Sequence, residues 1–156
     1  IRLSLVGSEM CIRDRMGSAP YLGGGFGHFF VYAPNKFKYP INRYSMEVKR
    51  QLSVLDNRLE ENEFISGSTY SIADMAIWPW YGRLALGRQY GKKAGKFLKV
   101  SEYTNVIRWA TQLDQREAVK RGEKVNRTSG DPSGQLRERH SKEDFDLYTQ
   151  DKISQS

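Results

Sequence analysis

The sequence is poor in cysteine and histidine and has no long apolar run. Its 156 residues include one cysteine, Cys11, and two histidines. A single thiol excludes an internal disulfide framework and a cysteine-based structural zinc site, and it is typical of a reducing compartment. The apolar runs are too short to cross a bilayer, and the first fifteen residues lack the unbroken apolar stretch of a secretory signal. We therefore expect a cytoplasmic protein that binds no metal and no membrane.

Length and composition predict one compact domain followed by a tail. A chain of 156 residues with 38% hydrophobic side chains can build a single core. Beyond residue 126 the sequence is polar, highly charged and nearly free of large apolar residues. Segments of this composition bury too little apolar surface to fold by themselves. We therefore expect a charged C-terminal tail over residues 127–156, in which His140 has no evident partner.

The formal charge of +7 is unevenly distributed along the chain. Residues 1–15 carry +1, residues 16–100 carry +6, and residues 101–156 are neutral. Most of the excess lies in residues 83–99, which contain several glycines and no acid. This composition favours a solvated loop. One hypothesis for function is therefore a free-standing helical module that binds an acidic partner or nucleic acid through the basic loop 83–99.

A long amphipathic helix is predicted over residues 41–59. Its apolar residues recur at intervals of three and four, so they share one face of a helix. They are Ile41, Tyr44, Val48, Leu52, Leu55 and Leu59. Pro40 marks the start of this helix, and the polar EENE stretch marks its end.

A second helix is predicted to begin at Ile72, within GSTYSIADMAIWPW. Ser71 and Asp74 have the spacing of a capping box, in which each side chain bonds a backbone N–H of the other end of the first turn. Tyr70 and Met75 are placed to form a hydrophobic staple across it. The run that follows is apolar on nearly all sides, which predicts a helix buried at the centre of the domain and bent at Pro79.

Two further helices are predicted over residues 102–113 and 118–125, where apolar residues keep helical spacing. With a short glycine-containing helix before residue 40, the whole plan is all-α.

Four stretches of the sequence together resemble a known family. They are GSAPYLGGGFGHFFVYAP, YPINRYSMEVKRQLSVLD, SIADMAIWPW and AVKRGEKVNRT. In order and spacing they are similar to the C-terminal helical domain of bacterial Nu-class glutathione transferases. Members of that class act as glutathione-dependent reductases of disulfide bonds and organic peroxides. The resemblance begins at about Met16 and implies a helical bundle over residues 16–126.

The resemblance also implies a part that this sequence lacks. Family members carry an N-terminal thioredoxin-like domain that binds most of the glutathione, and no strand pattern before Met16 corresponds to it. The opening SLVGSEMCIRDR instead resembles translated sequencing-adapter DNA. We therefore interpret residues 1–15 as a non-native segment.

Candidate binding residues follow from the resemblance. It places Arg43 in contact with glutathione, whose two carboxylates suit a guanidinium fork. The glycine-rich GGGFGHFF does not have the spacing of a phosphate-binding loop. In the family this helix lines the cleft between the domains, so Gly24 and Gly25 would let a ligand approach the backbone. His28 and Tyr32 would then face the second substrate, although the sequence favours an ordinary packed or exposed histidine at His28.

The expected activity is that of the intact family. Glutathione would be the co-substrate, a disulfide or peroxide the second substrate, and the intact enzyme a homodimer with no catalytic side chain in this half. The 156 residues alone are expected to be inactive. We also expect an exposed apolar surface where the missing domain would pack, around Tyr21, Leu22, Phe26 and Phe29.

Overall fold

A computed structural model describes residues 16–125 and 130–135. Within them the chain forms helices and turns, with a single isolated bridge between Phe64 and Gly67 and no strand, which confirms the all-α class. The chain divides into two compact units, residues 1–113 and 114–156. The expected non-native segment 1–15 and most of the expected tail, with His140, lie outside the described residues. Among the described residues, no helix is long and apolar enough to span a membrane.

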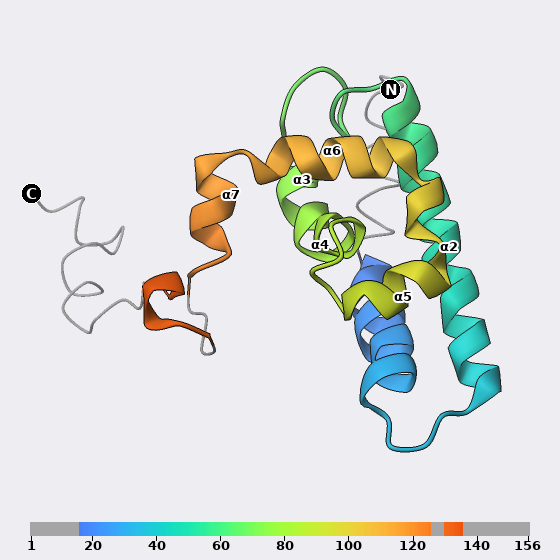
Figure 1. Ribbon diagram of the computed structural model, residues 1–156. Helices are drawn as coiled ribbons and strands as arrows, with labels where there is room; N and C mark the ends of the chain where they lie inside the picture. The colour runs from blue at the N-terminus through green and yellow to red at the C-terminus, as the bar shows by residue number, and fades with distance from the viewer. Residues whose placement is uncertain (1–15, 126–129, 136–156) are drawn as a thin grey trace, which may run out of the picture. The chain divides into compact units, whose positions relative to one another are not determined.

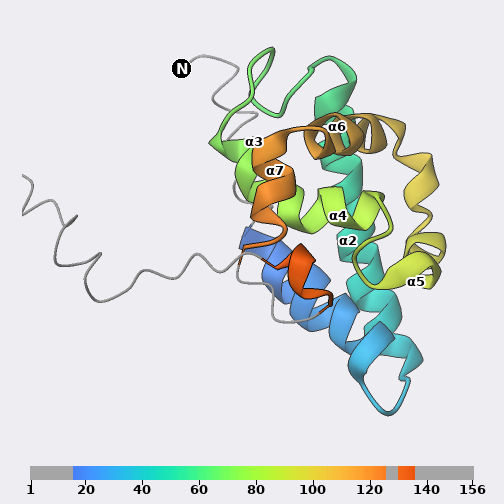
Figure 2. The same ribbon diagram turned by 60° about the vertical axis from the view of Figure 1, so that its left-hand side comes forward.

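The first unit is built on two long helices that pack side by side. Helix η1 (Ser18–Tyr32) is the expected glycine-containing helix, and α2 (Lys38–Glu60) runs along it (Figure 1, Figure 2). Helix η1 is wound as a π-helix, as the bond of 2.7 Å from the Ala33 N–H to the His28 carbonyl shows at its end. A five-residue link joins the two helices, so they run antiparallel.

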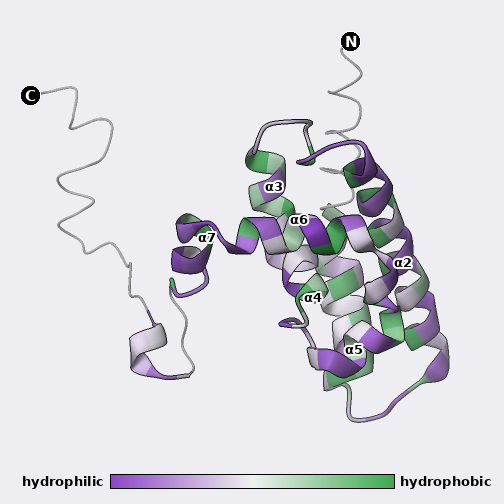
Figure 3. Cartoon of the chain, turned by 45° about the horizontal axis from the view of Figure 1, so that its top comes forward, coloured by the Kyte–Doolittle hydropathy of each residue, from purple (hydrophilic) through white to green (hydrophobic). Residues whose placement is uncertain are grey.

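The predicted amphipathic helix is confirmed in α2. Val48, Leu52, Leu55 and Leu59 are all buried on one face, and Figure 3 shows hydrophobic and hydrophilic residues alternating along the helix. The helix begins at Lys38, three residues before the predicted start. Pro40 is tolerated there because the N–H groups of a first helical turn have no partner within the helix.

Three short helical segments follow one another without a break: α3 (Ile72–Ile77), η2 (Trp78–Gly82) and α4 (Arg83–Ala85). Pro79 lies in η2, where the chain widens and the Arg83 N–H donates to the Trp78 carbonyl. A local π turn of this kind is a recognised way for a helix to accommodate proline.

The prediction of a helix buried at the centre of the domain is wrong for one face of α3. Ile72 is 76% exposed and Met75 is 53% exposed, while Ala73, Asp74 and Ile77 are buried. A helix at the edge of a core buries only one face, so apolar residues on its opposite face remain exposed to solvent. The ring of Tyr70 packs edge-on against Phe64, at 6.0 Å between centroids, while its expected staple partner Met75 lies at the surface.

The expected loop over residues 83–99 is also wrong. Residues of this stretch form α5 (Gly91–Leu98), which η3 (Val100–Glu102) and α6 (Thr104–Asp114) follow. Ala94 and Leu98 are buried and four residues apart, so one face of α5 packs while its lysines face outward. Tertiary packing of this face outweighs the low helix propensity of the glycines. Tyr90 and Lys99 bracket the helix with left-handed φ angles of 59° and 56°.

Helices α2 and α6 cap each other. The Asp56 carboxylate of α2 accepts hydrogen bonds from the Asn105 and Val106 N–H groups, at 2.9 and 3.0 Å, where α6 begins. In return, Arg108 of α6 donates to the Leu59 carbonyl at 2.8 Å, where α2 ends, and also to Asn62 at 3.0 Å. Each helix therefore satisfies backbone groups that the other leaves open.

The second unit contains α7 (Glu117–Gly122) and the 3₁₀ turn η4 (Pro132–Gly134). Helix α7 corresponds to the helix predicted over residues 118–125. None of its residues is buried, and Lys120 pairs with Glu117 at 2.8 Å on its surface.

Candidate functional site

Close helix packing requires glycine at two positions of η1, whereas a third glycine of this helix is exposed to solvent. A Cβ on Gly25 would overlap the ring of Tyr44, and one on Gly27 would lie 2.5 Å from the ring of Tyr90. Gly24 is exposed, and a Cβ there would meet only the Ala19 carbonyl at 3.6 Å. Gly25 is thus explained by helix packing, whereas Gly24 leaves backbone accessible at the surface.

The ring of Tyr44 joins α2 to η1 beside some of the predicted residues. The ring of Tyr44 stacks on Phe29 at 5.6 Å and 12°, and the exposed His28 lies edge-on to Phe29 at 4.9 Å. Arg43 precedes Tyr44 on α2 and is exposed. We call the contact between these two helices the η1–α2 seam, and Gly24, His28, Arg43 and Tyr44 are the residues of η1 and α2 considered there.

Tyr32 belongs to a different group of side chains. It is 69% exposed, and its ring meets Tyr90 at 6.1 Å in a T-shaped contact. Tyr90 in turn contacts Phe26 at 6.3 Å, and burial raises the pKa of the Tyr90 phenol. The structure therefore directs Tyr32 toward the segment before α5.

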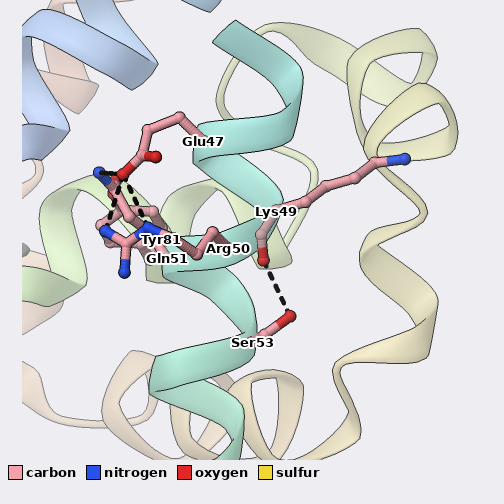
Figure 4. A network of polar contacts seen from close by, with 6 residues as sticks. All are labelled: Glu47, Lys49, Arg50, Gln51, Ser53 and Tyr81. Carbon is pink, nitrogen blue, oxygen red and sulfur yellow. Dashed lines mark hydrogen bonds and ion pairs between the residues drawn. The ribbon is translucent and has the colours of Figure 1, made fainter. Parts of the chain in front are cut away.

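A polar network along α2 begins at Glu47, one helical turn after Arg43, and Figure 4 shows its side chains. Glu47 accepts hydrogen bonds from Arg50 at 2.7 Å and from Gln51 at 3.1 Å, and the buried Gln51 accepts one from the Tyr81 hydroxyl of η2. The Arg50 hydrogen bond is the main cause that holds the pKa of Glu47 below its ordinary value, with the Arg43 charge a smaller one. The network links the exposed Arg50 through Glu47 and Gln51 to the buried Tyr81.

Ser71 and Asp74 form a capping box at the start of α3. The Ser71 N–H donates to Asp74 at 2.9 Å, and the Ser71 hydroxyl accepts from the Ala73 N–H at 3.3 Å. The fully buried Asp74 also accepts from the Ile65 N–H at 3.1 Å and from the indole of Trp109 at 2.8 Å. The Ser71 hydroxyl donates to Asp74 as well, at 2.9 Å, so four donors surround this buried carboxylate, and its position is structural.

The prediction of an exposed apolar surface around Tyr21, Leu22, Phe26 and Phe29 is wrong, because none of the four is exposed and Tyr21 and Phe29 are half-buried. Leu22 and Phe26 are completely buried, because Phe26 packs against the rings of Phe30 and Phe97 at 4.9 and 6.1 Å. Two exposed large apolar side chains, Val31 and Tyr32, lie at the end of η1, and the others among the described residues lie outside it: Met16, Phe37, Tyr39, Met46, Ile72, Met75 and Phe97. Among the described residues, no group of histidine, cysteine and acidic side chains is placed to hold a metal ion.

The sequence of this chain is similar to those of known proteins. Residues 41–111 match the family described as "Glutathione S-transferase, C-terminal domain". The chain contains a glutathione S-transferase C-terminal domain. The match covers most of α2 and extends through most of α6, so the reciprocally capped helices are the framework of this domain.

Relatives of this glutathione S-transferase domain include bacterial disulfide-bond oxidoreductases. The chain is 54% identical over 136 residues to the disulfide-bond oxidoreductase YghU of Escherichia coli K12, covering 87% of this chain and 46% of YghU. It is 45% identical to YfcG of the same organism, covering 66% of this chain and 43% of YfcG. The chain thus spans somewhat less than half the length of these relatives.

Solved structures show the same likeness. A glutathione transferase YghU from Streptococcus pneumoniae, complexed with glutathione, is 51% identical with a TM-score of 0.71, over 78% of this chain and 46% of that chain. A glutathione transferase from Burkholderia graminis, with two glutathione molecules bound per subunit, is 37% identical with a TM-score of 0.65, over 74% of this chain and 47% of that chain.

Sequence reasoning about this glutathione S-transferase domain missed the polar network and the aromatic neighbours of η1. The spacing of Arg43, Glu47 and Gln51 at intervals of four is a signal that could have indicated the network. The pairing of Gly25 with Tyr44 had no such signal, because it joins residues of two helices.

Proposed function

We propose that this chain is the helical half of a glutathione-dependent transferase that reduces disulfide bonds or organic peroxides. The η1–α2 seam carries the proposal, because its two packed helices present an exposed guanidinium, Arg43 on α2, and backbone that Gly24 leaves uncovered on η1. The similarity to disulfide-bond oxidoreductases and to structures with bound glutathione supports it. Residues 16–126 would form the helical domain, in a cytoplasmic homodimer whose thioredoxin-like domain binds most of the glutathione.

In the proposed reaction the sulfur chemistry belongs to glutathione. Its thiolate attacks one sulfur of the disulfide substrate, which gives a mixed disulfide and releases a substrate thiolate. A second glutathione thiolate then attacks the mixed disulfide, so glutathione disulfide leaves and the substrate is reduced. No protein thiol is required, and Cys11 lies outside the described residues. A relative from Pseudomonas putida was solved with one glutathione disulfide bound per subunit, which supports this product.

The residues of this chain would bind and orient the reactants. Arg43 would hold a glutathione carboxylate through paired N–H donors, and Gly24 would let the tripeptide approach the helix. His28 and Tyr32 would border the second substrate. Glu47 lies one turn after Arg43 and is itself held by Arg50 and Gln51, so it would limit the positions open to the Arg43 side chain.

The test is Arg43→Ala in the full-length enzyme that includes this sequence. Loss of a charge-assisted pair of hydrogen bonds worth about 1.5–3 kcal/mol should raise the KM for glutathione by roughly 10- to 100-fold. Arg121→Ala, which removes an exposed guanidinium from α7, is the matched control and should leave KM unchanged. An unchanged KM in Arg43→Ala would remove Arg43 from the proposed site.

The same proposal predicts that the 156-residue chain alone reduces hydroxyethyl disulfide with glutathione no faster than the uncatalysed reaction. Most of the glutathione site would lie on the other domain, so the thiol would not be oriented. Turnover by the purified chain above background, unaffected by removal of trace contaminants, would contradict this assignment of the site.

A further inference from the structure

The link between η1 and α2 exposes lysines and aromatic rings in alternation. Lys36, Phe37, Lys38 and Tyr39 follow one another there, and all four are exposed. Phe37 is 59% exposed and Tyr39 is 80% exposed. Lys36 donates to the Val31 carbonyl at 3.1 Å, which holds it against the end of η1. Exposed apolar side chains that lie together, with polar groups around them, mark an interaction surface.

Helix α5 adds a second set of lysines around one ring. Lys92, Lys93 and Lys96 are exposed, and Phe97 is 40% exposed. Lys92 and Lys96 are four residues apart, as are Lys93 and Phe97, so they form two neighbouring rows on the outer face of the helix. The ring of Phe97 lies 4.8 Å from that of Phe30, so it is supported from one side and open on the other.

The two sets of residues adjoin in space. Lys36 and Lys38 line one cavity together with Phe97. Helix α5 packs against α2, and Figure 1 shows it crossing beside the hairpin that η1 and α2 form. We call residues 36–39, together with Lys92, Lys93, Lys96 and Phe97, the basic aromatic surface.

No acid in these parts of the sequence offsets the positive charge. Residues 16–46 contain three lysines and arginines, residues 75–101 contain six, and neither range contains an aspartate or glutamate. Lys38 is the first residue of α2, whose first turn also has no acid, so the positive end of the helix dipole adds to the field there. Lys99 pairs with Glu102 at 3.1 Å and is left out of the basic aromatic surface.

The alternation of charge and ring distinguishes between classes of partner. A membrane-binding segment keeps its apolar face apart from its charges so that this face can enter lipid, whereas Phe37 has a lysine on each side. An acidic peptide would pair with the lysines and leave the rings uncovered. A single-stranded nucleic acid satisfies both, because each nucleotide brings a phosphate for a lysine and an open base face for a ring.

We propose that the basic aromatic surface binds single-stranded nucleic acid. The lysines of the link and of α5 hold its phosphates, and its bases stack on Phe37, Tyr39 and Phe97. Binding of this kind tolerates any base sequence, since every base has a face that can stack. The site requires neither glutathione nor Arg43, so this proposal and the glutathione proposal can fail independently of each other.

The experiment compares two fluorescein-labelled strands that carry the same phosphates. The 156-residue chain is titrated at low salt with an oligothymidylate of about twelve nucleotides and with an abasic strand of equal length, and fluorescence anisotropy reports binding. Stacking of one base on an aromatic ring corresponds to roughly 5- to 100-fold in affinity. We therefore expect the oligothymidylate to bind at least about fivefold tighter than the abasic strand.

A first variant tests the rings. Phe37→Ala/Tyr39→Ala removes two exposed side chains and should weaken binding of the oligothymidylate at least about fivefold, while the abasic strand binds as before. Ile72→Ala/Met75→Ala is the matched control, because it truncates two exposed apolar side chains on α3. It should leave binding of both strands unchanged. Circular dichroism checks that each variant is folded.

A second variant tests the charges. Lys92→Gln/Lys93→Gln/Lys96→Gln should weaken binding of both strands, and it should lower the slope of log K against log salt concentration by about 2. Lys120→Gln/Arg121→Gln/Lys124→Gln is the control, since it removes the same charge from exposed residues of the second unit. The slope should stay unchanged in this control.

Four outcomes overturn the proposal. They are equal binding of the two strands, no binding of either, ring or lysine variants that behave like their controls, and displacement of the oligothymidylate by polyglutamate as readily as by unlabelled oligothymidylate. Cosedimentation of the chain with phosphatidylserine vesicles, without binding of the oligothymidylate, would assign the same surface to a membrane and also overturn it.

Discussion

Replacing Asp74 tests whether this carboxylate only caps α3 or also holds Ile65 and Trp109 in place. The capping box alone predicts that Asp74→Ala costs about 0.5–2 kcal/mol of unfolding free energy. The structure predicts more, because the variant would also leave the Ile65 N–H and the Trp109 indole N–H without an acceptor, and both residues are fully buried. Each unsatisfied buried donor costs about 1–3 kcal/mol. The expected total is about 2.5–8 kcal/mol, a large part of the stability of a domain of this size.

Urea unfolding followed by tryptophan fluorescence and by circular dichroism measures this loss. Ser71→Ala is the matched control, since it removes the capping hydroxyl but keeps the acceptors for Ile65 and Trp109, and it should cost about 1 kcal/mol. Asp74→Asn retains one acceptor oxygen and should fall between the two. If Asp74→Ala costs no more than Ser71→Ala, the reasoning that joins three segments through this carboxylate is refuted.

Two further predictions concern η1 and α2. Gly25→Ala should lower the free energy of unfolding by about 1–3 kcal/mol, because its methyl group would overlap the Tyr44 ring. Gly24→Ala in the same helix has room for the methyl group and should be neutral or slightly stabilising. Urea unfolding compares the two variants, and equal effects would contradict the close packing at Gly25. The pKa of Glu47 is lowered from its ordinary value of 4.5 chiefly by the Arg50 hydrogen bond, so its stabilisation is fully present above pH 4.5 and is lost as pH falls further. The stability difference between the unchanged chain and Glu47→Gln should therefore shrink on acidification below pH 4.5, and a difference that grows there would reverse the sign of the argument.

Local patterns predicted the features that depend on neighbouring residues. The stripe of α2 from Val48 to Leu59 and the pair Ser71 and Asp74 are repeated spacings within one helix or one turn, so they are visible in the sequence. The helix over residues 104–114 follows from the same kind of periodicity.

Features that join distant segments could not be predicted in this way. The burial of Ala94 and Leu98 makes a helix of a glycine-rich stretch that reads locally as a loop. The exposure of Ile72 and Met75 depends on which face of a short helix meets the core, which their apolar character does not reveal. At the candidate site, the accessibility of Gly24 and Arg43 agrees with a binding role that stays a prediction.

The reciprocal capping of α2 and α6 has a consequence for how the domain opens. Because the amide protons at the start of α6 are held by Asp56, and the carbonyls at the end of α2 by Arg108, neither end can fray without releasing the other. These two ends, about fifty residues apart in sequence, should therefore exchange hydrogen with solvent at one shared rate and behave as a single cooperative unit. The amide protons at the start of α6 would thus be protected from exchange, although the ends of helices ordinarily exchange fastest.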